Sequence, residues 1–474
     1  MVERSLLPDF SPAALAELDK IQAPAPMAQE SLRDLRELLW CSIDNDDSLD
    51  LDQLTVAEAL PGGSVKILVA VADVDGLVKD GTAIEDHARH NATTVYTAAE
   101  NFSMLPEKLS TDLTSLNLNE ERQSIVIEMV TGTDGSLESF DVYRALVRNH
   151  AKLAYDSVGA WLEGQGAAPE GITAVDGLAE NLHVQDVAAQ AMKTLRHVHG
   201  ALSLETVEAR PLFDGDAITA LKAEQKNRAT DIIEDLMITA NGATAQFLVA
   251  KGSPSIRRVV RAPERWDRIV EIAAAHDFKL PDAPDAKALE DFLTKQKAAD
   301  PVGFPDLSLS VIKLLGAGEY VAQLPDDTGE GHFGLAVKDY THSTAPNRRY
   351  SDLITQRLLK AVLRGDPSPY SPDQLVALAT HCTHQENVAE KVERQVAKSA
   401  AALFLASRIG EQFDAVITGA APKGTWVRVL TVPVEGKLAQ GFEGLDVGDR
   451  VHVQLISVDV DQGYIDFARA GAPA

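Results

Sequence analysis

The chain contains one densely acidic stretch, Cys41-Ser42-Ile43-Asp44-Asn45-Asp46-Asp47-Ser48-Leu49-Asp50-Leu51-Asp52-Gln53. Five aspartates lie within nine of these positions, and apolar residues such as Trp40 and Leu54 flank them. Carboxylates held at the edge of a core repel one another and raise one another's pKa. A hard divalent cation relieves that repulsion, and oxygen ligands favour Mg²⁺, Mn²⁺ or Ca²⁺. The stretch therefore predicts a carboxylate–metal site.

Two other interpretations of the stretch exist. The spacing that begins at Asp44 resembles an EF-hand calcium loop, but Leu49 replaces the required Gly and Thr55 replaces the required Glu. A solvated acidic turn is the second alternative. The spacing of Asp44, Asp50 and Asp52 favours a site over that turn.

The composition is typical of a soluble globular protein with more than one domain: 474 residues, 45% hydrophobic and 24% charged. No apolar run reaches the roughly 18 residues of a membrane span, and the start lacks a signal-peptide pattern. The two cysteines, Cys41 and Cys382, indicate neither a disulfide framework nor a zinc site. We therefore expect a cytoplasmic monomer with no membrane partner.

The formal net charge of −27 limits how nucleic acid could bind. Binding to phosphates requires clustered Lys and Arg, and the average surface of this chain repels polyanions. A nucleic acid would have to be bound locally, in a basic groove or channel.

Sequence patterns place the acidic stretch among sheet strands. The β-branched run over 64–74 predicts a buried strand, and 116–131 with 137–147 predict a hairpin around Gly132–Gly135. A short helix with Ser11 as its N-cap is expected near the start. Further helices are expected over 175–250, 262–300, 349–364 and 372–409. After Gly410, short strands at regular spacing predict a small barrel.

A second motif is Tyr340-Thr341-His342-Ser343-Thr344-Ala345-Pro346-Asn347-Arg348-Arg349-Tyr350-Ser351-Asp352. Its hydroxyls and paired arginines lie on a loop that opens a helix, and such donors suit phosphate oxygens. Composition alone is equally compatible with a surface arginine pair held in ion pairs by this acidic protein.

Together these motifs resemble the ribonuclease II/ribonuclease R (RNB) family of 3′-to-5′ exoribonucleases. That family shows Thr/Ser-Ile-Asp and, six residues after that Asp, Asp-x-Asp-Asp. The second motif is similar to its Tyr-Thr-His-x-Thr-Ser-Pro-Ile-Arg-Arg-Tyr-x-Asp signature. Blocks at 72–110, 234–241 and 389–394 agree in family order. The tail, at 413–419 and 424–427, resembles the OB-fold RNA-binding domain of the ribosomal S-one type.

The resemblance implies an α+β fold. An RNB catalytic domain, a mixed sheet with surrounding helices, is expected over 41–408, after a lead-in helix and linker over 1–40. A C-terminal OB-fold, a five-stranded β-barrel, is expected over 409–474. Only forty residues precede Cys41, so we expect the two N-terminal cold-shock domains of the bacterial enzymes to be missing.

The resemblance also implies the catalytic groups. Asp44, Asp50 and Asp52 would hold Mg²⁺, with Mn²⁺ as an alternative, at the scissile phosphate. Arg348 would stabilise the phosphate in the transition state, so Asp52 and Arg348 are the expected catalytic residues. Gln53 stands where the family has a fourth aspartate; its amide offers a carbonyl oxygen but no charge.

The expected RNA contacts are Tyr96, Arg348, Arg349 and Glu393. Tyr96 would stack on bases near the 3′ end, with a core tyrosine as the alternative. Glu393 matches a glutamate near the exit region, with a helix-surface charge as the alternative. The family's RNA enters a deep channel. Arginines such as Arg257 and Arg258 could make that channel basic although the protein as a whole is acidic.

The resemblance finally implies the reaction: Mg²⁺-dependent hydrolysis of single-stranded RNA from its 3′ end, releasing nucleoside 5′-monophosphates. Gln53 supports an alternative, a catalytically weakened RNA-binding protein of the same fold. Leu204, where the family often has a stacking Phe, would weaken the grip on bases. The second motif and the tail disfavour a metal-binding protein unrelated to RNA.

Overall fold

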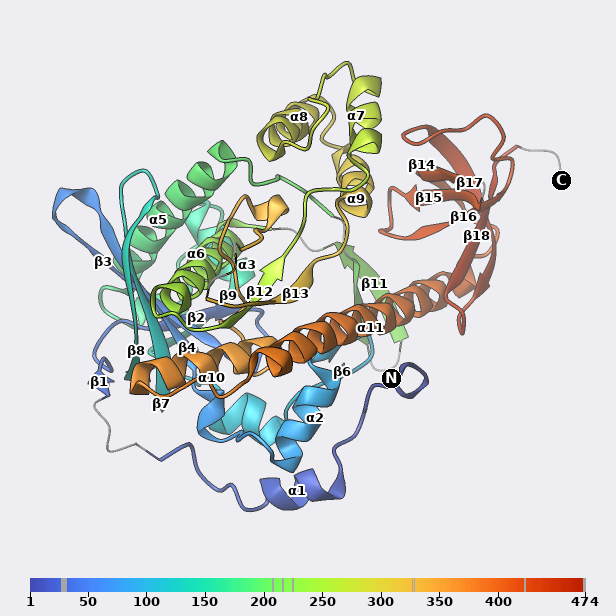
Figure 1. The fold of residues 1–474 in the computed structure, drawn as a ribbon. Coiled ribbons are helices and arrows are strands. Elements are labelled where there is room, and N and C mark those ends of the chain that lie inside the picture. Colours follow the sequence, from blue (N-terminus) through green and yellow to red (C-terminus); the bar gives the residue numbers. More distant parts are fainter. Residues whose placement is uncertain are drawn as a thin grey trace.

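The computed structural model describes residues 1–26, 32–206, 209–214, 217–223, 226–325, 327, 329–421 and 423–471. Residues 27–31 of the expected linker and 472–474 of the expected barrel domain lie outside this description. Elements are labelled as in Figure 1.

The centre of the molecule is a seven-stranded mixed sheet in the order β1-β8-β7-β4-β3-β2-β9. Pairs β1–β8 and β2–β9 are parallel, and the other neighbours are antiparallel. The expected strand and hairpin are confirmed as β4 and β7–β8. The bounds are β1 (Arg33–Asp34), β2 (Cys41–Asp44), β3 (Gln53–Ala59), β4 (Val65–Ala72), β7 (Glu121–Thr131), β8 (Leu137–Arg148) and β9 (Ala151–Ala154).

Helices bury the apolar strands of this sheet. The run Ile67–Ala72 in β4 is almost fully buried, so both faces of the strand are covered. Residues of α5 (Leu178–Val198), α6 (Arg228–Ala250) and α10 (Tyr350–Arg364) share its hydrophobic core. The other helices of the catalytic part are α2 (Ala83–Asn91), α3 (Tyr155–Leu162), α4 (Glu170–Thr173), α7 (Trp266–Ala275), α8 (Ala286–Ala299) and α9 (Phe304–Leu315).

Capping residues begin two of the helices where the sequence predicts them. Ser11 Oγ accepts the Ala14 N–H at 3.2 Å and starts α1 (Pro12–Leu18). Ser371 forms a capping box with Gln374 at the start of α11 (Pro372–Leu405). This 34-residue helix runs along the catalytic part and reaches the barrel (Figure 1).

The expectation that 175–250 is helical throughout is wrong. A hairpin of β10 (Ala209–Asp214) and β11 (Ala217–Ala223) separates α5 from α6. α5 ends just before Gly200, whose φ of 98° is outside the helical range, and Pro211 further on lacks the N–H that a helix interior requires. Two further strand pairs lie beside α11: β5 (Val95–Tyr96) with β6 (Asn101–Phe102), and β12 (Ser255–Val259) with β13 (Glu319–Gln323).

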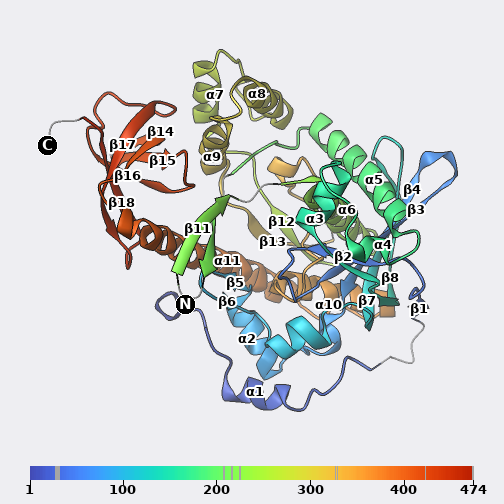
Figure 2. The same cartoon turned by 180° about the vertical axis from the view of Figure 1, so that it is seen from behind.

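The C-terminal strands close into a five-stranded barrel, as expected from their spacing. They are β14 (Gln412–Ala421), β15 (Gly424–Val429), β16 (Glu435–Gln440), β17 (Arg450–Asp459) and β18 (Tyr464–Arg469). Seen from behind in Figure 2, the barrel lies at one end of α11 and the large sheet toward the other. The expected α+β fold class with a terminal barrel is therefore confirmed. Within the described residues, no helix has the length and apolarity to span a bilayer.

Candidate active site

The acidic stretch forms the connection between β2 and β3, with Asp44 ending β2 and Gln53 beginning β3. Backbone hydrogen bonds hold it against its surroundings. Leu51 donates its N–H to Ser115 Oγ at 2.9 Å, and the Asp52 carbonyl accepts the Ala72 N–H at 3.0 Å. The loop is therefore fixed at the residues that carry the carboxylates.

Asp52 is the most enclosed of these carboxylates, with 3% of its surface exposed. Its Oδ1 accepts the Asn347 N–H at 2.9 Å, while Oδ2 is buried and accepts no hydrogen bond. Burial raises the pKa of Asp52 to about 7, against the lowering effect of the Arg348 guanidinium. A buried carboxylate oxygen without a donor is costly, so Oδ2 suits a cation ligand.

Asp50 and Asp44 continue the line of carboxylates. Burial raises the pKa of Asp50, and the charge of Asp44 raises it further. Tyr96 Oη donates to Asp50 Oδ2 at 3.4 Å. Asp44 Oδ1 accepts hydrogen bonds from the Asn45 N–H at 2.7 Å and from Ser48 Oγ at 3.0 Å. The three signature carboxylates therefore act on one another electrostatically.

These carboxylates fit a metal whose coordination is completed by other molecules. In the described part of the chain, no three His, Cys, Asp or Glu side chains gather closely enough to form a metal cage. Mg²⁺ usually keeps several waters and binds through one or two carboxylates plus substrate phosphates. The oxygen-only donor set matches that behaviour, and so does Asp52 Oδ2, which accepts no hydrogen bond.

The second motif lies directly against Asp52. Its turn is fixed by three buried contacts: Asn241 Oδ1 accepts the Ser343 N–H at 2.9 Å, Asp352 Oδ1 accepts the Ala345 N–H at 2.8 Å, and Asp52 accepts the Asn347 N–H.

Arg348 follows that turn, and its carbonyl accepts the Thr94 N–H at 2.9 Å. The Nε atom of Arg348 lies 3.4 Å from Asp52 Oδ2, and 40% of the side chain is exposed. A rigid backbone thus holds an accessible guanidinium beside the carboxylates.

The other arginines expected in the channel are engaged internally. Arg349 donates to both oxygens of the fully buried Asp352, at 2.9 and 2.8 Å. Arg257 is 1% exposed, so the expectation that it contributes to a basic channel surface is wrong. Arg258, its neighbour on β12, forms an ion pair with Glu386.

Tyr96 and Glu393 meet each other beside the acidic loop. The Tyr96 N–H donates to Glu393 Oε1 at 2.8 Å, which joins β5 to α11. Tyr96 is 41% exposed, so it is not a core tyrosine, and its ring is accessible for stacking. The sequence predicts Tyr96 and Glu393 as separate RNA contacts. The structure joins them, because Tyr96 is hydrogen-bonded to Glu393 through its backbone and to Asp50 through its hydroxyl.

Sequence reasoning missed three residues of this site. Asn347 stands where the family pattern has Ile; it is 1% exposed and its Oδ1 accepts a hydrogen bond from Thr114 Oγ1 at 2.5 Å. Tyr155, at the start of α3, feels the charges of Asp44 and Arg348, although burial is the main reason that its pKa is raised. Asn347 could have been noticed in the sequence, because it departs from the family pattern. Thr114 and Tyr155 carry no local sequence signal that would have pointed to the site.

Two other residues were singled out by comparison with the family pattern. Leu204 lies away from the acidic loop, and Gln53 lies in the site but hydrogen-bonds to the second motif. Leu204 packs against the apolar cluster of α7, α8 and α9. The Gln53 side chain is half-buried, and its Nε2 donates to the Thr344 carbonyl at 2.6 Å.

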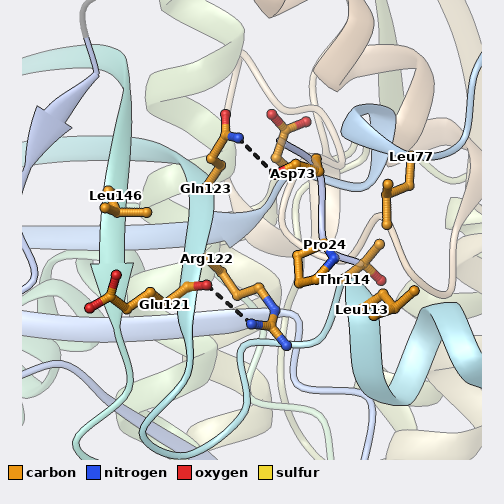
Figure 3. Close-up of a pocket in the computed structure, with 10 residues that line it drawn as sticks. Pro24, Asp73, Leu77, Leu113, Thr114, Glu121, Arg122, Gln123 and Leu146 are labelled. Atoms are coloured by element: carbon orange, nitrogen blue, oxygen red, sulfur yellow. Dashed lines mark hydrogen bonds between the residues drawn. The ribbon is translucent and has the colours of Figure 1, made fainter. Parts of the chain in front are cut away.

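The cavity shown in Figure 3 is separate from the acidic loop. The cavity has a volume of about 200 Å³, and its lining includes Asp73, Thr114, Arg122 and Gln123. Gln123 Nε2 donates to the carbonyls of Ala25 and Pro26, at 3.1 and 2.7 Å. The cavity thus belongs to the contact between the N-terminal segment and the sheet.

Comparison with known proteins gives two family matches. The model of the RNB domain matches residues 32–365, and the model of the RNase II-type exonuclease C-terminal S1 domain matches residues 411–470. Ribonuclease R of Aquifex aeolicus is 31% identical over 468 residues, which cover 92% of this chain and 64% of that protein. Ribonuclease R of Escherichia coli is 29% identical over 472 residues, covering 92% of this chain and 57% of that protein.

Among solved structures, Mycoplasma genitalium RNase R in complex with ribose-methylated single-stranded RNA superimposes with a TM-score of 0.88. The match has 22% sequence identity and covers 99% of this chain and 77% of that one. At that identity the match shows a shared fold. The chain spans about three fifths of the length of the curated relatives named above.

Proposed function

The chain belongs to the RNB family, and from that premise we propose that it is a 3′-to-5′ exoribonuclease. Its substrate is single-stranded RNA, its metal is Mg²⁺ with Mn²⁺ as a substitute, and its products are nucleoside 5′-monophosphates. One observation carries the proposal: Arg348 Nε and Asp52 Oδ2, from motifs at opposite ends of the catalytic part, lie 3.4 Å apart.

The arrangement supports a hydrolysis in which water attacks the last phosphodiester of the strand. The oxygen of water forms a bond to phosphorus, the bond from phosphorus to the preceding O3′ breaks, and O3′ takes up a proton. The terminal nucleotide therefore leaves with its 5′-phosphate. A bound Mg²⁺ supplies Lewis-acid activation and neutralises developing charge at that phosphate. Asp52 Oδ2 and the carboxylates of Asp50 and Asp44 are the groups that would hold it.

The remaining side chains position and stabilise the reacting phosphate. Arg348 donates N–H groups to its non-bridging oxygens, where negative charge grows in the transition state. The exposed ring of Tyr96 stacks on a base near the 3′ end. Arg349, which the family resemblance predicts as an RNA contact, supports the site through its bidentate pair with Asp352.

The net charge of −27 restricts where RNA approaches this protein. The repulsive average surface favours a narrow, locally basic approach to Arg348 over broad surface binding. We further propose that the protein acts in the cytoplasm, because the two described cysteines are free and buried, and that it is a monomer.

The test uses 5′-labelled single-stranded RNA with Mg²⁺ and with EDTA. The wild type should shorten the RNA stepwise from the 3′ end with Mg²⁺ only. Asp52→Asn keeps the size of the side chain but removes its charge, and should reduce the rate by about 100-fold or more, as expected for a transition-state electrostatic contact. Equal rates for the two proteins, or cleavage at internal positions, would refute the proposal.

Gln53 favours a second candidate, a catalytically weakened RNA-binding protein of the same fold. The site carries one carboxylate fewer than the family pattern, because the Gln53 amide is neutral. This candidate predicts retention of RNA on a filter without shortening, and a gain of cleavage in Gln53→Asp. The same assay therefore separates the two candidates.

A further inference from the structure

Gln53 connects the two motifs directly. It is the first residue of β3, and its backbone is held in register with Val71 of β4. From this fixed position its side chain reaches the Thr344 carbonyl, 2.6 Å from Nε2. A carbonyl oxygen only accepts hydrogen bonds, so the amide nitrogen, rather than the amide oxygen, must face Thr344.

Asp52 and Gln53 both bind the 344–347 turn, Asp52 as a hydrogen-bond acceptor and Gln53 as a donor. Asp52 Oδ1 accepts the N–H of Asn347, and Gln53 donates to the carbonyl of Thr344. These two backbone groups lie on either side of Pro346, just before Arg348. The last residue of the acidic loop and the first residue of β3 therefore fix both ends of the segment that presents the guanidinium.

A carboxylate at position 53 could not make this contact. Aspartate and glutamate are acceptors only when ionised, and either would place a negative charge against the Thr344 carbonyl. The position at which the family pattern has a metal-ligand aspartate is thus used for another purpose in this chain.

We propose that Gln53 is a positioning residue: its hydrogen bond to Thr344 holds the 344–347 turn so that the Arg348 guanidinium lies against Asp52. The proposal rests on the proposed function for its catalytic consequence, but the structural contact can be measured without RNA. It also assigns no metal-ligand role to Gln53.

Two variants remove the contact in different ways. Gln53→Glu keeps the length but lacks a donor, and Gln53→Met keeps the approximate length without any polar group. Misplacement of a catalytic group by about 1 Å costs about 100-fold in rate, so each variant should lower kcat by about 10- to 100-fold. The KM for single-stranded RNA should stay within about threefold. Glu58→Gln, at an exposed position of the same strand paired with Lys66, is the matched control and should retain wild-type kcat.

Pairing each variant with Arg348→Ala tests whether Gln53 acts through that arginine. If it does, Gln53→Met should cost less than about twofold in a protein that already lacks the guanidinium. The proposal would be overturned if the fold-losses in kcat of Gln53→Met and Arg348→Ala multiply in the double variant. It would also be overturned if Gln53→Glu and Gln53→Met alone both keep the wild-type kcat. An increase of kcat in Gln53→Glu would instead indicate a ligand role.

Two readouts on the RNA-free protein keep the result separate from the proposed function. Hydrogen–deuterium exchange over 343–349 should rise at least about threefold in Gln53→Met, with exchange in the barrel unchanged; unchanged exchange over 343–349 overturns the proposal. The Kd for Mn²⁺, followed by electron paramagnetic resonance, should stay within about twofold of wild type, and a loss of about tenfold or more would overturn it. An inactive wild type with these expected readouts would refute the exoribonuclease and leave the positioning role supported.

Discussion

At the scale of single residues, Asp52 is the point at which the two motifs meet. Its buried carboxylate binds the backbone before Arg348 and keeps one oxygen without a donor. The two sequence motifs predict Asp52 and Arg348, because short motifs record which chemical groups are needed, and the structure places the two side chains 3.4 Å apart. The sequence could not reveal that Gln53 reaches Thr344, because that contact depends on how distant segments meet. The pair of Arg349 with Asp352 is local, at i,i+3 spacing, but which carboxylate Arg349 binds depends on the turn that opens α10.

Two substitutions of Tyr96 separate the role of its hydroxyl, which contacts Asp50, from the role of its ring, which is proposed to stack on a base. Tyr96→Phe removes only the 3.4 Å hydrogen bond to Asp50, so the KM for RNA should change less than about twofold. Tyr96→Ala removes the exposed ring, and base stacking of about 1–3 kcal/mol should raise that KM by about 5- to 160-fold. Initial rates over a range of RNA concentrations give both values. Equal KM values for the two variants would contradict a stacking role.

At the scale of elements, packing determines which helices and strands form the site. Hydrophobic periodicity predicted β4, β7, β8, α6 and α11, whose apolar faces are long and regular. It missed the β10–β11 hairpin, because the general helical character of the region obscured the local meaning of Pro211. It also missed the short pair β5–β6, which is too brief for periodicity but carries Tyr96 to the site.

The contact between α5 and α8 predicts a pH dependence of stability. His197 Nδ1 lies 3.2 Å from the buried Glu290 carboxylate, and the hydrogen bond to Glu290 raises the pKa of His197 despite its burial. A group with a raised folded-state pKa stabilises fully below its unfolded value, near 6.5, and loses that contribution as the pH rises through the folded value.

Wild-type protein should therefore lose about 0.5–1 kcal/mol of stability, relative to His197→Gln, between pH 6 and pH 8.5. Urea unfolding of both proteins at the two pH values measures the difference. The interpretation fails if the gap between them is the same at both values, or larger at pH 8.5.

At the scale of the whole molecule, one ion pair fastens the barrel to the helical segment beside it. Arg428 of β15 donates to both oxygens of Asp306 in α9, at 2.8 and 2.7 Å, and both side chains are largely buried. Figures 1 and 2 both show α9 next to the barrel. Sequence patterns predicted a small barrel and the family resemblance predicted its five strands, but a contact between the barrel and a distant helix leaves no periodic signal.

Asp306→Ala should loosen the barrel, because it leaves the Arg428 guanidinium without its partner. Hydrogen bonds to charged groups are worth about 1.5–3 kcal/mol, so the docked state should lose that much relative to an undocked one. Limited proteolysis between 406 and 411 should become at least several-fold faster, while Asp46→Ala, at an exposed position far from the barrel in sequence, should not change it. Unchanged proteolysis in Asp306→Ala would show that the pair does not hold the barrel.

The central claim is that Asp52 and Arg348 form one centre for hydrolysis at the 3′ end of RNA. The most direct measurement is the chemical identity of the product released from uniformly labelled single-stranded RNA in Mg²⁺. We expect the wild type to release nucleoside 5′-monophosphates, and Asp52→Asn and Arg348→Ala to release about 100-fold less or none. Nucleoside 3′-monophosphates, internal fragments, or undiminished product from either variant would contradict it.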